Sequence, residues 1–342
     1  MQITAITSMR DEGPHCLEWI AHHLAIGVDH FLVYTNDCSD GTDQIMDVLA
    51  EAGIVSHFRT RQKGKSPVQW QSLKQAWGHP KVTGADWVLI SDCDEFINLR
   101  PPLATLADLI AALPQEADAV AMAWRLFGNA GHLKMRDQLT TDRFTMAAPT
   151  DIALPLAHFF KTLFRPSAFR QPGVHRPKRH KDRLPLWVDG SGNRLPEGFA
   201  KQDGRINLFG LPHGSELVQL NHYSLRSAES FLIKRTRGLP NHTQREIGLG
   251  YWVERNFNTV QDTSIQRFSV QTQRKLDQLR LIPELEALHQ TAFAHHQQQF
   301  DRMMQDRDHI QLFWHLALAA GSEPPGRALA RAQVGRIIAA QQ

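Results

Sequence analysis

Short apolar segments alternate with amphipathic helical patterns over about the first hundred residues, and this alternation limits the fold more than any other feature. Strands that are buried on both faces are typically apolar almost throughout, and such segments occur at residues 3–6, 31–34, 54–58 and 87–90. Between them the spacing of apolar residues becomes helical, at residues 17–24, 45–52 and 68–77. This order of strands and helices predicts an α/β fold with a mostly parallel sheet and right-handed crossovers.

The remaining chain is less regular. Thr105 and Asp108 form a capping-box pattern that predicts a further helix, and residues 119–125 are expected to return to the sheet. Pro and Gly are frequent in residues 127–220, which predicts long substrate-binding loops. Helical patterns resume near residue 227 and dominate from residue 269 to the end.

Parallel sheets bind ligands at the carboxyl ends of their strands, and an acidic cluster follows the segment 87–90. It consists of Asp92, Asp94 and Glu95, with Cys93 between the first two. In an extended segment Asp92 and Asp94 project to the same side and repel each other unless a cation lies between them. Hard oxygen ligands suit Mg²⁺ or Mn²⁺, which would in turn hold a diphosphate. The alternative is that these acids only cap a turn or form a solvated loop.

A second polar cluster, residues 36–42, follows the segment 31–34. The carboxylate of Asp37 could accept hydrogen bonds from a base or ribose, unless it serves only the turn, whereas Asp40 is expected to be structural. A P-loop spacing is missing, and no G-x-G-x-x-G pattern follows the first strand. This argues against a kinase, an ATPase or a Rossmann dehydrogenase.

Taken together, these motifs resemble the family 2 glycosyltransferases, specifically the branch related to glycosyltransferase family 92, in which a strand ends in D-x-D-E-F. The matching residues occur in the expected order along the chain: Arg10, Asp11, Glu12, 18–20, 27–31, 36–42, 92–96, Trp124, Phe127, Gly128, 173–177, 221–224, Ser227, Phe231, Lys234, Arg235 and Gly238. One departure is Asp11, because the family pattern usually has Asn before Glu12.

The resemblance implies a GT-A fold and inversion at the sugar carbon. It divides the chain into a GT-A domain at residues 1–240, with a nucleotide-binding half at 1–126 and an acceptor half at 127–240. A helical C-terminal region would follow at residues 241–342.

The resemblance also implies roles for particular residues. The donor-binding residues would be Glu12, Asp37, Asp92, Lys234 and Arg235. The ligands of Mg²⁺ or Mn²⁺ would be Asp92, Asp94 and His222, although a lone histidine is more often a surface or core residue. The catalytic base is not identified, and Asp142 and Glu216 are candidates because they lie in the loop-rich half. The donor would by default be a UDP-sugar, and the acceptor a glycan or a lipid-linked hydroxyl.

Charge and cysteine content restrict the partners and the compartment. A formal charge of +3 is too small to indicate a nucleic-acid-binding protein. The three cysteines form no close pair, which favours a reducing compartment over a disulfide framework or a zinc site. The N-terminal residues lack the pattern of a signal peptide, and no apolar stretch is long enough to span a bilayer. We therefore expect a cytoplasmic protein whose membrane contact, at the inner face, is peripheral.

Two basic segments have no assigned role. Between Lys161 and Arg183 there are eight Lys or Arg residues and a single acid, which predicts either a solvated face or a site for an anion. After Pro325, Arg327, Arg331 and Arg336 recur beside apolar residues that include Ile337 and Ile338. This helix would either dock on the domain or rest on anionic lipid.

Two other functions compete with sugar transfer. A sugar nucleotidyltransferase would be expected to carry a Gly-rich triphosphate loop. A catalytically silent sugar- or partner-binding module would have no need for Asp92, Asp94 and His222 together.

Overall fold

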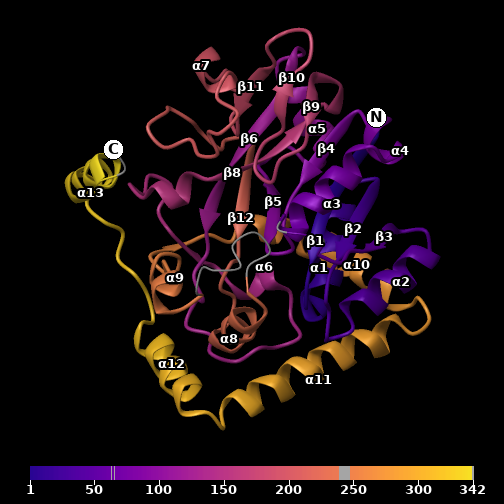
Figure 1. Ribbon diagram of the computed structural model, residues 1–342, viewed down its shortest axis with the longest axis vertical. Helices are drawn as coiled ribbons and strands as arrows, with labels where there is room; N and C mark the ends of the chain where they lie inside the picture. Colours follow the sequence, from indigo (N-terminus) through magenta and orange to yellow (C-terminus); the bar gives the residue numbers. More distant parts are fainter. Residues whose placement is uncertain (63, 65, 239–246, 341–342) are drawn as a thin grey trace.

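The computed structural model describes residues 1–62, 64, 66–238 and 247–340, which form a central sheet flanked by helices (Figure 1). Within this part of the chain the sheet has nine strands, in the order β3-β2-β1-β4-β8-β6-β12-β5, with β11 also paired to β6. The sheet strands are β1 (Ile3–Met9), β2 (His30–Thr35), β3 (Val55–Arg59), β4 (Trp87–Ile90), β5 (Glu95–Leu99), β6 (Ala117–Leu126), β8 (Phe160–Phe164), β11 (Leu186–Asp189) and β12 (Val218–His222). Two small ribbons pair β7 (Met146–Ala147) with β13 (Val260–Gln261) and β9 (Phe169–Gln171) with β10 (Lys178–His180).

The longer helices begin and end near the positions that the sequence predicts, whereas the short helices at residues 80–83, 140–143, 197–200 and 249–253 were not predicted. The capping box is present, because the Thr105 hydroxyl accepts a hydrogen bond from the Asp108 amide and the Asp108 carboxylate accepts one from the Thr105 amide. The α-helices are α1 (Gly13–Ala25), α2 (Thr42–Glu51), α3 (Val68–Trp77), α4 (Pro80–Thr83), α5 (Leu106–Ala112), α6 (Thr140–Arg143), α7 (Glu197–Ala200), α8 (Ala228–Arg237), α9 (Leu249–Val253), α10 (Ser269–Arg280), α11 (Leu285–Met303), α12 (Arg307–Leu318) and α13 (Arg327–Ala340). Short 3₁₀ helices are η1 (Pro155–His158), η2 (Pro166–Ala168) and η3 (Ser264–Phe268).

The first four strands confirm the predicted alternation. β1 pairs in parallel with β2 and with β4, and β2 pairs in parallel with β3. Each predicted apolar segment falls within or overlaps one of these strands, and α1, α2 and α3 occupy the predicted helical positions. Local periodicity was sufficient here because both faces of these strands are covered.

The second half of the sheet is mixed, because β6 pairs in parallel with β11 and β12 while other pairs are antiparallel. All pairs among β1 to β4 are parallel, so the expectation of a mostly parallel sheet is met fully only there. β8 is antiparallel to both β4 and β6, and β5 is antiparallel to β12. β5 begins at Glu95, the last residue of the acidic cluster, and pairs with β12 and not with β4. β8 and β11 lie in the segment that the sequence predicts as loops.

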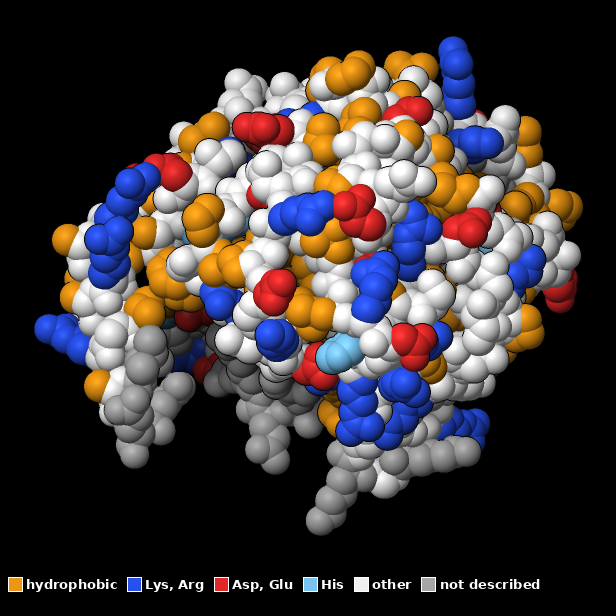
Figure 2. All heavy atoms as spheres, turned by 90° about the horizontal axis from the view of Figure 1, so that it is seen from above, with side chains coloured by type: hydrophobic (Ala, Val, Ile, Leu, Met, Phe, Trp, Pro, Cys, Tyr) orange, Lys and Arg blue, Asp and Glu red, His pale blue; other side chains and the backbone are white. Residues whose placement is uncertain are grey.

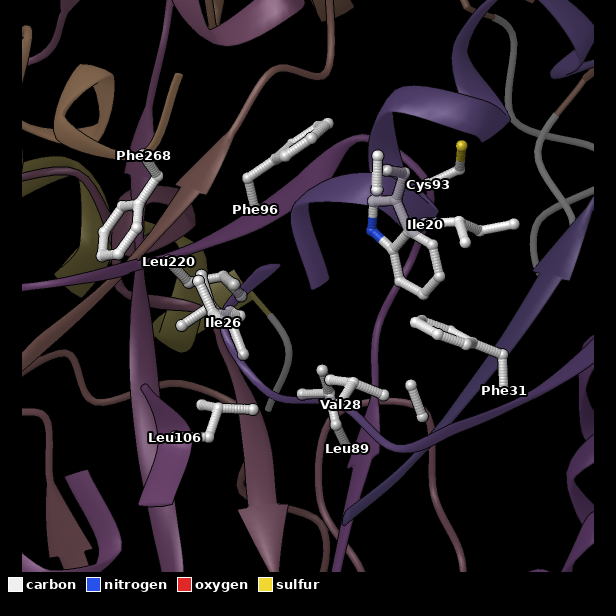
Figure 3. Close-up of a cluster of buried hydrophobic side chains, with 14 of the residues drawn as sticks. Ile20, Ile26, Val28, Phe31, Leu89, Cys93, Phe96, Leu106, Leu220 and Phe268 are labelled. Atoms are coloured by element: carbon white, nitrogen blue, oxygen red, sulfur yellow. The ribbon is translucent and has the colours of Figure 1, made fainter. Parts of the chain in front are cut away.

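Apolar side chains from both ends of the chain meet on one face of the sheet (Figure 3). Ile20 of α1 and Phe31 of β2 belong to the same buried cluster as Phe96 of β5, Leu220 of β12 and Phe268 of η3. A second buried cluster covers the opposite face. The sheet is therefore a rigid support for the residues at its strand ends.

The C-terminal helices contact α1 and the loop before α2 through buried histidines. His22 on α1 lies 3.3 Å from the Thr272 hydroxyl on α10, and His296 on α11 lies 2.8 Å from the Asp40 carboxylate. Figure 1 shows α11 crossing the lower edge of the molecule, with α12 and α13 on its left side. The predicted domain boundary at 240/241 and the side chains of Ile337 and Ile338 fall outside the described residues. None of the helices in the described ranges is long and apolar enough to cross a bilayer.

Candidate functional site

A cavity of about 310 Å³ opens at the carboxyl ends of the sheet strands. Its lining includes residues that follow β1, β2 and β4, and residues near the ends of β6 and β12. This is the edge of the sheet where the sequence predicts ligand binding. The lining residues used below are Arg10, Glu12, Asp37, Gln69, Asp92, Asp94, Trp124, Leu156, Phe159, Val174, His175, Ile206, His222, Lys234, Arg237, Tyr251 and Arg255.

The acidic cluster forms a turn instead of an extended segment. The Glu95 amide donates a hydrogen bond to the Asp92 carbonyl at 3.1 Å, which closes the turn before β5 begins. The two acids consequently bind different partners. Asp92 accepts hydrogen bonds from Lys161 at 2.8 Å and from Gln69 at 2.9 Å, while Asp94 accepts one from Lys234 at 2.7 Å. The positive charge that these acids require is supplied, in this structure, by two lysines.

Glu95 stabilises the turn from inside the core and does not line the cavity. Its side chain is fully buried and accepts hydrogen bonds from the Ser91 hydroxyl at 3.0 Å and the Trp124 indole at 2.7 Å. Burial raises the pKa of Glu95 to about 8, and the Lys161 ammonium 3.5 Å away opposes that rise. The sequence groups Glu95 with the site, but its role here is to position Trp124 and the turn.

Asp94 and His222 face each other across the cavity wall, with 3.7 Å between a carboxylate oxygen and Nε2. Burial alone would raise the pKa of Asp94, but the charges of Lys234 and His222 hold it well below its usual value. Burial lowers the pKa of His222, which favours the neutral imidazole that can bind a metal. The ionised carboxylate is a hard oxygen ligand that suits Mg²⁺ or Mn²⁺, and the neutral imidazole beside it is a softer ligand for a divalent cation.

The full metal set that the sequence predicts is not assembled. No group of three or more His, Cys, Asp or Glu side chains suited to a metal ion occurs in the described ranges. The carboxylate of Asp92 is bonded to Lys161 and Gln69. Two protein ligands remain, and a magnesium ion held by so few takes its other ligands from phosphate and water.

A buried ion network joins the loop after β1 to α8. Glu12 accepts hydrogen bonds from Arg226 at 3.0 Å and from Arg237. Arg226 also donates to the Cys93 carbonyl at 3.0 Å, and Arg237 donates to the carbonyls of Arg10 and Asp11. This network fixes the acidic turn, the β1–α1 loop and the cationic end of α8 relative to one another.

The loop after β2 carries Asp37, which is exposed and lines the cavity. The backbone of Asp37 has a positive φ of 45°. Asp11 holds this loop, because its carboxylate accepts a hydrogen bond from the Ser39 amide at 2.6 Å. Asp40 is buried and bonds Thr42, Gly13 and His296, as expected of a structural residue.

The glycosyltransferase family 92 model matches residues 11–189, which is more than half of the chain. The chain belongs to glycosyltransferase family 92. A family 92 protein of rice (Oryza sativa subsp. japonica) is 25% identical over 168 residues, or 47% of this chain and 26% of the relative. A family 92 protein of Ricinus communis is 26% identical over 167 residues, or 47% of this chain and 28% of the relative. The match thus spans only about a quarter of the length of these relatives.

Solved structures match more weakly. Staphylococcus aureus TarS 1-349 in complex with UDP has a TM-score of 0.30 and 16% identity, covering 49% of this chain and 48% of that one. Glucosyl-3-phosphoglycerate synthase from Mycobacterium tuberculosis, in complex with Mn²⁺, UDP and glucosyl-3-phosphoglycerate, has a TM-score of 0.25 and 16% identity, covering 36% and 44%. These scores are too low to support a statement about this chain.

Three predicted site residues of this family 92 chain do not line the cavity as the structure describes it. Arg235 lies on α8 beside Lys234, outside the lining. Asp142 bonds the Ser269 hydroxyl at the start of α10, and Glu216 is exposed in the loop before β12, where its amide bonds Ser191. The sequence also missed Tyr251 and Arg255, because no local pattern marks them.

The basic segment that begins at Lys161 does not converge on one anion. Lys161 is buried at the acidic turn, the Arg165 guanidinium lies 4.6 Å from the centre of the Trp87 ring, and Arg183 bonds Asp118 at 2.6 Å. On the face shown in Figure 2, Lys and Arg side chains are intermixed with Asp and Glu. These three residues are thus held by structural contacts at separate places.

Proposed function

We propose that this family 92 chain is a glycosyltransferase with a GT-A arrangement, which moves a sugar from a nucleotide-sugar donor to a hydroxyl acceptor with inversion. The observation that carries the proposal is a single cavity lined by Asp94, His222, Lys234 and Arg237 at the carboxyl ends of the strands. A carboxylate and an imidazole can hold a divalent cation, and two cationic side chains beside them can hold a diphosphate. The nucleotide-binding half would be residues 1–126, the acceptor half 127–240 and the helical region 241–342.

The donor would lie along the strand ends from β2 to β4. β2 is two strands away from β4 in the sheet, which corresponds to roughly 10 Å. The base and ribose of a UDP-sugar would therefore bind toward Asp37, and the diphosphate toward Asp94. Glu12 supports this part of the cavity by holding Arg237 in place.

Asp94 and His222 would hold the Mg²⁺ or Mn²⁺, which supplies positive charge to the departing diphosphate. Lys234 and Arg237 supply further charge from α8, and they are held by bonds to Asp94 and Glu12. Asp92 would contact the ribose or act as a positioning residue, since Lys161 and Gln69 fix its carboxylate.

The decisive experiment is calorimetry with UDP, with and without MnCl₂, followed by an assay of UDP release from a panel of UDP-sugars. Metal-dependent UDP binding and UDP release are the expected results. Binding without turnover toward any acceptor would favour the silent binding module. Pyrophosphorolysis of a UDP-sugar would favour the nucleotidyltransferase.

The acceptor would be a glycan or a lipid-linked hydroxyl, met in the cytoplasm or at the inner face of the membrane. Support for membrane contact comes from α13, where Arg331, Arg336 and Leu329 are exposed. Against it, Arg327 bonds Asp151 at 2.7 Å and Ala330 is buried, as in a docked helix. Sedimentation with anionic vesicles should decide between a membrane-bound and a docked α13. If α13 binds lipid, vesicle binding should be lost on truncation at Pro325 and should weaken with added salt.

A further inference from the structure

Sugar transfer requires a base for the acceptor proton, and three of the carboxylates that line the cavity are already bonded to cations. Glu12 is held by two arginines, Asp92 by Lys161 and Asp94 by Lys234. Asp37 is exposed, but it follows β2, four strands away from β6 and roughly 19 Å from the acceptor side of the sheet. A different kind of group is therefore needed on the acceptor side.

His175 lines the cavity on that side and packs beside the rings of Trp124 and Phe159, at centroid distances of 5.7 and 5.4 Å. Its Nδ1 lies 3.0 Å from the carbonyl oxygen of Phe160. A carbonyl oxygen can only accept, so Nδ1 carries the hydrogen and Nε2 of the neutral ring has a free lone pair. No hydrogen-bond partner of Nε2 occurs among the residues that the structure describes.

The loop that carries His175 is built to hold one conformation. The Thr162 hydroxyl on β8 donates to the His175 carbonyl at 2.7 Å. Arg176 is buried, and its guanidinium donates to the carbonyls of Phe199 and Arg205 at 3.1 Å. A Cβ at Gly173 would lie 2.2 Å from the Arg176 carbonyl oxygen, so the turn closes only without a side chain there. The motif at residues 173–177 thus positions the imidazole ring of His175.

The surroundings of the ring favour attack by a sugar hydroxyl. Leu156, Phe159, Val174 and Ile206 give this part of the cavity apolar walls, which limit water. The Trp124 indole contacts His175 on one side and His222 on another, at 5.7 and 4.2 Å between ring centroids. Trp124 therefore packs against both the proposed metal ligand His222 and the imidazole ring of His175.

Resting on the function proposed above, we propose that His175 is the general base of the transfer. Nε2 accepts the proton of the acceptor hydroxyl while the hydroxyl oxygen forms its bond to the anomeric carbon. The bond between that carbon and the diphosphate oxygen breaks, and its electron pair leaves with the nucleoside diphosphate. The proton then passes from Nε2 to solvent, and no oxidant or reductant is involved.

The surroundings of His175 keep its ring unprotonated in the absence of donor. Burial, together with the charges of Lys161 and His222, lowers the pKa of His175 to about 4, although the bond to Phe160 and the charge of Asp92 oppose this. The ring is therefore neutral at pH 7. A nucleoside diphosphate bound nearby adds negative charge, which raises the basicity of Nε2 when the donor is present.

The test compares His175→Asn with the matched control His180→Gln, an exposed histidine on β10. The Asn amide can still donate to the Phe160 carbonyl, so the variant keeps that bond but has no base at the Nε2 position. The assay is UDP release from UDP-glucose, UDP-galactose and UDP-N-acetylglucosamine, with water as acceptor. We expect His175→Asn to lose about 10²- to 10⁴-fold in kcat, with UDP binding by calorimetry unchanged, and His180→Gln to match the parent.

His175→Ala provides a second measurement, because the space it leaves can admit imidazole. Added imidazole should restore part of the UDP release of His175→Ala and none of that of Asp94→Asn. The proposal is overturned if the turnover of His175→Asn lies within threefold of that of the parent. It is also overturned if His175→Asn loses UDP binding and turnover in parallel, because that would indicate a structural role. If the parent itself releases no UDP from any of these sugars, the proposed function fails and this inference fails with it.

Discussion

Replacing Asp94 by Asn removes the negative charge that Lys234 neutralises 2.7 Å away, while keeping the shape of the side chain. Removing one partner of a buried ion pair typically costs about 3–5 kcal/mol. We expect a smaller loss, about 2 kcal/mol at pH 7, because Lys234 keeps its bond to the Ser224 carbonyl at 2.9 Å and can be hydrated from the cavity.

The loss should depend on pH in a defined direction. Burial alone would raise the pKa of Asp94, yet Lys234 and His222 hold it well below its usual value. A carboxyl with a lowered pKa stabilises the fold fully above its unfolded-state pKa of about 4, and that stability disappears as pH falls toward the folded-state pKa. The difference in unfolding free energy between Asp94→Asn and the parent should therefore be largest at neutral pH and shrink below pH 4.

Urea unfolding at pH 7 and pH 3 measures the stability difference, and calorimetry with UDP and MnCl₂ measures donor binding. Asp151→Asn is the control, because Asp151 forms an exposed ion pair with Arg327 that should contribute less than about 1 kcal/mol. Asp94→Asn should lose metal-dependent UDP binding, and the control should keep it. The reasoning is refuted if Asp94→Asn is as stable as the control at pH 7 and binds UDP with Mn²⁺ as the parent does.

Four further substitutions test the site and its support. Lys161→Met should lower the free energy of unfolding in urea by about 3 kcal/mol, because it removes the fully buried ammonium that forms ion pairs with Asp92 and Glu95. An unchanged unfolding midpoint would contradict this. Gly173→Ala should cost about 1–3 kcal/mol and reduce UDP release, since its Cβ would lie 2.2 Å from the Arg176 carbonyl oxygen; parent-like stability would argue otherwise. Burial would raise the pKa of Asp40, but bonding to a histidine lowers it to about 2, so Asp40→Asn should destabilise more at pH 7 than at pH 2. Cys93→Ser should keep metal-dependent UDP binding in calorimetry, because a thiol is not a hard ligand; loss of binding with an intact fold would show the turn to be misread.

The sequence by itself determined the elements whose stability depends on neighbours along the chain. The apolar periodicity of β1 to β4 and their intervening helices is a local property, and so is the capping box between Thr105 and Asp108. The place of Asp92 and Asp94 at a strand end follows from the same patterning. A motif of this kind can be recognised without knowledge of its spatial neighbours.

Only the tertiary structure decided which charges meet. Lys161 and Lys234 reach Asp92 and Asp94 from 69 and 140 residues away, and nothing in either local sequence predicts those pairs. The antiparallel direction of β8 and the position of His175 likewise depend on contacts between distant segments. Charge compensation acts through space between groups that are desolvated together, so it is determined only when the chain has folded around them.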